Sequence, residues 1–172
     1  MTTIESNQKI LEFLLKKREY NKNLYFMPRM VNNKDRLSKG YYFLGNDEYV
    51  HISFWKGKDS KEKIHNIGFV VLVDGASYIE ITCRENNEQK ISQLKDLSKK
   101  LINNSLRFEQ KNNSYKVRFY YSTKDYLTNL NHFIENEKKV IDEFLKKNNI
   151  EGISFLDDNF HSKYVLSRIL NK

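Results

Sequence analysis

Basic and aromatic side chains are interleaved along the segment 29–63, and residue types of this kind can bind a nucleic acid. Two polar, turn-like stretches carry the cations, and an aromatic run lies between them. The cations are Arg29, Lys34, Arg36, Lys39, Lys56, Lys58, Lys61 and Lys63, and the aromatic residues are Tyr41, Tyr42, Phe43, Tyr49, Phe54 and Trp55. Cations hold a phosphate backbone, and flat rings accept bases. The competing interpretation is solvated charge on two turns, with the rings in the core.

An expected hairpin over residues 41–55 would position these groups. Its turn is Gly45-Asn46, so both basic stretches would flank the opposite end, where Tyr41 and Trp55 would meet beneath the cations. Such a ring pair can stack on a base or wedge into a duplex. We therefore expect phosphate contacts from Arg29, Lys34, Arg36, Lys39, Lys56, Lys58 and Lys61. We expect contacts with a base from Tyr41, Tyr49, Trp55 and Tyr78.

Catalytic chemistry has weaker support in this sequence. Asp74 and Glu80 flank a turn as in metal-dependent nucleases, but Thr82 occupies the position where those enzymes have lysine. A turn Asp and a solvent-facing Glu explain the two residues better. The four histidines lack metal-ligand spacing, and His51 belongs to a cleft or to the surface. Cys83 falls on the apolar side of its strand, as a structural cysteine would. P-loop, dinucleotide and nucleophile-elbow motifs are absent, so we expect no cofactor and no metal.

Length, composition and charge indicate the number of domains, the kind of partner and the compartment. The chain has 172 residues, a hydrophobic content of 39% and a formal net charge of +8. This length favours a single domain over residues 1–172, and the charge favours an acidic partner, with nucleic acid before a membrane surface. One cysteine, no signal-peptide region and no apolar run of membrane-spanning length lead us to expect a cytoplasmic protein.

The hydrophobic pattern predicts an α+β fold. Helices are expected over 3–19, 87–102, 125–147 and 158–170, from apolar residues at three- and four-residue steps. Strands are expected over 41–44, 49–55, 67–73, 77–83, 106–109 and 115–121, with 24–27 as a strand or an extended segment. Asp74-Gly75 is a hairpin signal. Tyr78, Glu80 and Thr82 should face outward or into a cleft. The sheet should have five or six mainly antiparallel strands, with long helices packed on one face.

The element order resembles a known family. An aromatic strand ends in Phe43-Leu44-Gly45, an apolar strand runs from Gly68 to Leu72, and a helix, a Tyr-rich strand and a long striped helix follow. This order is similar to the N-terminal DNA-binding domain of McrB-type modification-dependent restriction proteins, over roughly residues 3–147. The resemblance implies binding of DNA with modified cytosine and flipping of the modified base into an aromatic-lined pocket. It also implies a GTP-driven motor and a nuclease subunit as partners.

The resulting functional hypothesis is a DNA-binding specificity module of a bacterial restriction or defence system, which reads double-stranded DNA, methylated DNA included. It would work with a motor or nuclease subunit and would not be an enzyme itself. A protein-interaction module with an acidic partner, such as an immunity or adaptor protein, is the alternative. A small nuclease that uses Asp74 and Glu80 is the third possibility.

Overall fold

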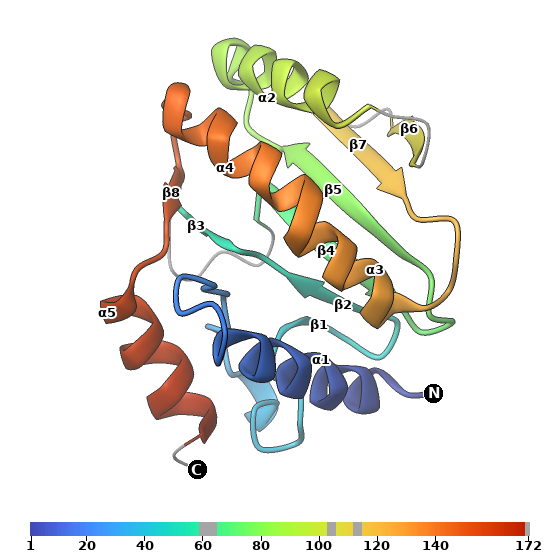
Figure 1. The fold of residues 1–172 in the computed structure, drawn as a ribbon, viewed down its shortest axis with the longest axis vertical. Helices are drawn as coiled ribbons and strands as arrows, with labels where there is room; N and C mark the ends of the chain where they lie inside the picture. Colours follow the sequence, from blue (N-terminus) through green and yellow to red (C-terminus); the bar gives the residue numbers. More distant parts are fainter. Residues whose placement is uncertain (59–64, 103–105, 112–114, 171–172) are drawn as a thin grey trace.

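A six-stranded antiparallel sheet forms the centre of the computed structural model, and helices cross one of its faces (Figure 1). The structure describes residues 1–58, 65–102, 106–111 and 115–170. The strand order is β1-β2-β4-β5-β7-β6, and β3 and β8 form a separate two-stranded sheet. The strands are β1 (Leu44–Gly45), β2 (Tyr49–Ile52), β3 (Trp55–Gly57), β4 (Ile67–Leu72), β5 (Ser77–Cys83), β6 (Arg107–Lys111), β7 (Tyr115–Tyr120) and β8 (Ile153–Phe155). The expected α+β class with a mainly antiparallel sheet is confirmed.

The helices begin at polar caps that satisfy free backbone N–H groups. A capping box begins α1 (Thr3–Arg18), with Thr2 and Glu5 bonded reciprocally. Asn87 caps α2 (Glu88–Leu101) through the backbone N–H of Lys90. Asp125 caps the helix that begins at Tyr126, and its carboxylate accepts from the backbone N–H of Thr128.

Two helical stretches close the chain. The first is a 22-residue helix made of α3 (Tyr126–His132), a π-helical turn (Phe133–Glu137) and α4 (Lys138–Lys147). The second has 13 residues, α5 (Asp158–Phe160) followed by π-helical His161–Leu170. A short 3₁₀ turn, Asn33–Asp35, lies earlier in the chain. In the described part of the chain, no helix is long and apolar enough to cross a membrane.

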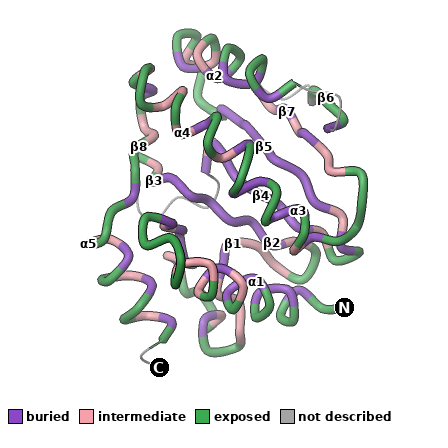
Figure 2. Tube along the Cα trace, viewed as in Figure 1, coloured by how far each residue is buried: buried purple, intermediate pink, exposed green. Residues whose placement is uncertain are grey.

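The core fills the space between the sheet and the helices. Phe69, Ile79 and Phe119 point into it from three neighbouring strands, and Leu94 and Leu130 meet them from α2 and α3. Figure 2 shows β4 and β5 coloured as buried, and every residue of β5 is buried. The hairpin expected at Asp74-Gly75 is confirmed, since Val71 pairs with Ser77 across it.

The strands expected over 41–44 and 49–55 differ from those observed. Only Leu44 and Gly45 pair with β2, and the chain leaves the main sheet after Ile52. Trp55 then begins β3, which pairs with β8 near the other end of the sequence. The expectation that Trp55 continues the β2 strand is therefore wrong, because the chain bends between the two sheets.

Candidate functional site

One row of side chains crosses the face of the sheet that the helices do not cover. Directly paired residues on neighbouring strands place their side chains on the same face. Across the six strands the row is Leu44, His51, Val70, Tyr78, Tyr120 and Arg107. Val70 and Tyr78 are buried, yet neither belongs to the core cluster. We call this side of the sheet the polar face.

A pocket of ≈ 280 Å³ is hollowed into the polar face, and we call it the sheet-face pocket. Its apolar and aromatic lining comes from Leu44, Tyr49, Val70, Leu72 and Tyr78. Its volume lies just below the usual range for small-molecule sites, roughly 300–1,000 Å³. A pocket of this size suits a single planar ring.

A charge pair and a tyrosine occupy the middle of the pocket. Arg118 Nε donates to Glu80 Oε2 at 2.9 Å, and the Arg118 guanidinium lies 4.6 Å from the centre of the Tyr78 ring. Burial alone would lower the pKa of Arg118, but its hydrogen bond to Tyr120 and the charge of Glu80 raise that pKa. Glu80 and Arg118 thus neutralise one another, and the floor of the pocket carries little net charge.

Further charged residues line the pocket toward solvent. Arg84 is exposed, Lys116 is half-buried, and the acidic Glu48 is exposed. With Glu80 and Arg118 paired to each other, two cations face one carboxylate. The pocket therefore combines a nearly neutral floor with a positive excess around it, an arrangement that favours a neutral ring attached to an anionic backbone.

His51 lines the pocket beside a glycine that makes room for it. A Cβ atom at Gly68 would lie 2.3 Å from Cε1 and from Nε2 of His51, closer than any real Cβ contact. The imidazole therefore occupies the space that a side chain at position 68 would fill. Gly68 pairs with Glu80 on β5, so the ring also lies beside the charge pair.

The His51 ring is buried without a hydrogen-bond partner on another described residue. Its exposed fraction is 4%, and both Nδ1 and Nε2 are unpartnered. Burial, reinforced by His65, lowers the pKa of His51 to about 3. The two imidazole centroids lie 6.1 Å apart. His51 is therefore neutral at physiological pH, with one ring N–H donor and one ring nitrogen acceptor.

Of the four residues expected to contact a base, two lie in the sheet-face pocket and two lie elsewhere. Tyr49 and Tyr78 both line the sheet-face pocket. Tyr41 does not line it: its hydroxyl bonds to Asp47, and its ring lies 5.3 Å below the Arg36 guanidinium.

Trp55 lies in the core, so the expected pairing of Tyr41 with Trp55 is wrong. The Trp55 side chain is almost completely buried and its Nε1 donates to Asp142 Oδ1 at 2.9 Å. Its ring contacts Phe54 and Phe133 edge-on. Contact between Trp55 and a base would require this ring to leave the core.

The arginines of the first basic stretch hold their own loop together. Arg29 is buried, donating from Nε to the carbonyl of Tyr41 at 3.1 Å and from a terminal nitrogen to that of Gly45 at 2.7 Å. Burial lowers the pKa of Arg29. Arg36 reaches the same Gly45 carbonyl at 3.4 Å. Buried Arg29 is thus committed to loop carbonyls and unsuited to a phosphate.

The described lysines of the two basic stretches lie outside the sheet-face pocket. Lys34, Lys39 and Lys56 are exposed, and the Lys56 ammonium lies 6.0 Å from the Phe160 ring. Lys58 is also exposed, and its Nζ lies 3.9 Å from Glu151. None of them lines the sheet-face pocket. Lys61 and Lys63 lie outside the described residues.

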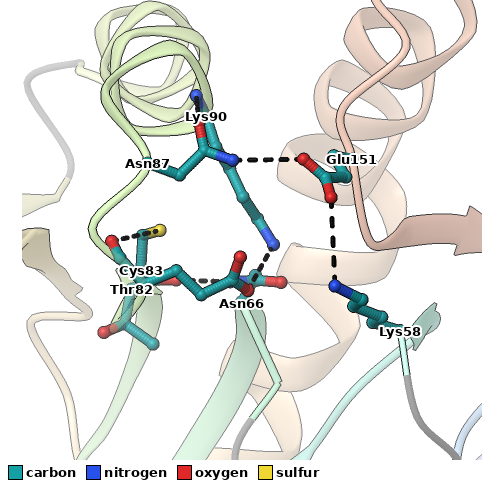
Figure 3. Close-up of polar contacts among 8 residues, drawn as sticks. Lys58, Asn66, Thr82, Cys83, Asn87, Lys90 and Glu151 are labelled. Carbon is teal, nitrogen blue, oxygen red and sulfur yellow. Dashed lines mark hydrogen bonds and ion pairs between the residues drawn. The ribbon is translucent and has the colours of Figure 1, made fainter.

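The contact of Lys58 belongs to a polar cluster that joins β3 to the start of α2 (Figure 3). Asn87 Nδ2 donates to the second oxygen of Glu151 at 3.1 Å. The buried Lys90 ammonium lies 3.0 Å from Glu85 Oε1. Each group of this cluster has a partner from the protein, so we assign the cluster a structural role.

The carboxylates considered for a nuclease are engaged separately. Asp74 accepts from the backbone N–H of Ala76 and pairs with Lys124 at 3.1 Å, whereas Glu80 pairs with Arg118. Over the described residues, no group of three or more histidine, cysteine or acidic side chains could hold a metal ion. Cys83 is fully buried in the core, as its strand position predicted.

Sequence reasoning missed most of the charged part of the pocket. Alternation along 77–83 did indicate that Tyr78 and Glu80 share one face. The strand over 115–121 was also expected, and alternation along it places Lys116 and Arg118 together. What the sequence lacks is the register that sets Arg118 opposite Glu80.

The chain was compared with protein-family models, with characterised proteins and with solved structures, and no match was found.

Proposed function

We propose that this protein is a DNA-binding specificity module of a bacterial restriction or defence system. In this proposal it takes one base of double-stranded DNA, modified bases included, out of the stack and into the sheet-face pocket. The observation that carries the proposal is the pocket itself, which combines Tyr49 and Tyr78 with the cations Arg84 and Lys116. Rings accept the base, and cations hold the flanking phosphates.

A second depression extends the same surface along the sheet. The Tyr78 and Tyr120 rings lie 5.0 Å apart, and Tyr120 also lines a hollow of ≈ 570 Å³ with Arg107 and Lys124. The Arg107 guanidinium lies 4.3 Å from the centre of the Tyr120 ring. Both cations are exposed and pair with Glu109 and Asp74 in this structure, so a phosphate beside the base-sized pocket would replace a carboxylate as their partner. The formal net charge of +8 also supports an anionic partner.

The resemblance to McrB-type DNA-binding domains supports the same proposal and suggests partner subunits. By that resemblance, a motor or a nuclease subunit of the same system would act on the DNA that this module selects. The module itself would bind DNA without cleaving it.

Binding to short duplexes at two salt concentrations tests the proposal. We expect the affinity to fall steeply as salt rises, because bound lysines and arginines release counterions from the DNA. Lys116→Ala or Arg84→Ala should each reduce the slope of log K against log salt by about one. Lys99→Ala is the matched control, because Lys99 is exposed on α2, on the helix side of the sheet, and should leave the slope unchanged.

A wild-type protein that binds no duplex even at low salt would contradict the proposal. The alternative, a module that binds an acidic protein, would then be tested by pull-down before and after nuclease treatment. A complex that survives the nuclease would support this alternative.

A further inference from the structure

Among the described residues that line the sheet-face pocket, His51 is the one whose side-chain polar atoms are buried without a hydrogen-bond partner. A buried polar group without a hydrogen bond costs stability, so most such groups are paired. Glu80 and Arg118 satisfy each other, and Arg84 and Lys116 reach solvent. The His51 nitrogens have neither a partner nor solvent.

The position of His51 suits contact with a ligand. It lines the pocket together with Tyr49 and Tyr78, and its ring fills the space above Gly68. The neutral imidazole presents no charge to a ligand in the pocket. A neutral imidazole offers one N–H donor and one nitrogen acceptor, and either ring nitrogen can take either role. The matching ligand is an uncharged planar ring with a polar edge.

We infer that His51 reads a hydrogen-bonding edge of the base in the sheet-face pocket and so determines which base is preferred. This inference rests on the proposed function and adds the residue that distinguishes one base from another. The tyrosine rings accept any base by stacking, since every base has a flat face. A hydrogen bond to the edge depends on the identity of the base, because a base with a mismatched edge leaves the buried His51 nitrogens unpaired.

The test compares the affinities of duplexes that differ at one central base pair. The set contains unmodified DNA, DNA with a modified cytosine, DNA with a modified adenine, and DNA with an abasic site. We expect wild-type protein to prefer one of the three intact duplexes over the other two and to bind the abasic duplex without this advantage. His51→Phe keeps a ring but removes both nitrogens, and it should weaken binding of the preferred duplex by roughly five- to tenfold.

Two further measurements separate reading from folding. His51→Gln retains a donor and an acceptor, and it should recover part of the preference that His51→Phe loses. Thermal melting establishes that each variant is folded. The salt slope should stay at the wild-type value in both variants, because His51 is neutral and contacts no phosphate.

The outcomes distinguish this inference from the proposed function. Salt-dependent binding by wild-type protein without any preference among bases would overturn the role of His51 and leave DNA binding intact. A folded His51→Phe variant with the wild-type preference would do the same. Failure of wild-type protein to bind any duplex would remove both the inference and the proposed function.

Discussion

At the scale of single residues, Gly68 and His51 act as a pair. Position 68 lies in a central strand and pairs with Glu80, and a glycine inside a strand weakens it and needs a reason. The reason is steric, because the His51 imidazole occupies the place of a side chain at position 68. The two positions should therefore be coupled energetically.

Gly68→Ala should lower the free energy of unfolding by about 1–3 kcal/mol, because the new methyl group displaces a packed ring. The same change in a His51→Ala background should cost much less, because the obstructing ring is gone. Urea unfolding of the two single variants and the double variant measures this coupling. Equal costs of Gly68→Ala in both backgrounds would show that the ring is not what fills the site.

At the scale of elements, the Trp55 side chain connects β3 to α4. Trp55 donates to Asp142, which also pairs with Lys138 at 2.8 Å. The Lys138 ammonium lies 5.8 Å from the Trp55 ring. The tryptophan thus connects the two-stranded sheet to the long helix and contributes to stability through burial and a hydrogen bond.

Trp55→Phe should reduce the free energy of unfolding by about 1–3 kcal/mol, because the buried hydrogen bond to Asp142 is lost. Binding to DNA and the preference among duplexes should stay as in the wild type, because Trp55 does not line the sheet-face pocket. Urea unfolding and anisotropy on the same preparation measure both effects. A stable variant that has lost its DNA preference would restore Trp55 as a base-contacting residue.

Local patterns in the sequence predicted the elements better than the site. Asp74-Gly75 and the apolar run of β4 are signals within a few residues, and both gave the correct structure. Trp55 was misplaced because its partners, Phe155 and Asp142, are remote in sequence. Arg118 was missed for a related reason: its register against Glu80 is set across an inserted helix, α2.

At the scale of the whole molecule, three buried histidines make stability depend on pH. Burial, as the main cause, lowers the pKa of His51 to about 3, of His65 to about 4 and of His161 to about 4, from an ordinary value of 6.5. Between pH 6.5 and 4 the unfolded chain binds protons at these positions and the folded protein does not. Stability therefore rises with pH across this window and falls on acidification.

The free energy of unfolding should decrease between pH 7.5 and pH 5 by about 2 kcal/mol for each of the three histidines, at ~1.4 kcal/mol per proton and pH unit. Urea unfolding at several pH values measures the slope. His161→Phe should reduce the slope by one proton, since the ring packs edge-on against Phe26 and a phenyl group can replace it. A free energy of unfolding that stays constant over this range would contradict the burial of these histidines as neutral groups.

The pairing of β3 with β8 also bears on the order in which the protein forms. Trp55 and Phe155 are 100 positions apart in sequence, and joining them costs more loop-closure entropy than forming the short β4–β5 hairpin. On a ribosome, the chain emerges from its amino terminus. Every described residue that lines the sheet-face pocket lies between Leu44 and Arg118. The whole pocket is therefore synthesised before Asp142 and Phe155, the residues that enclose Trp55, leave the ribosome.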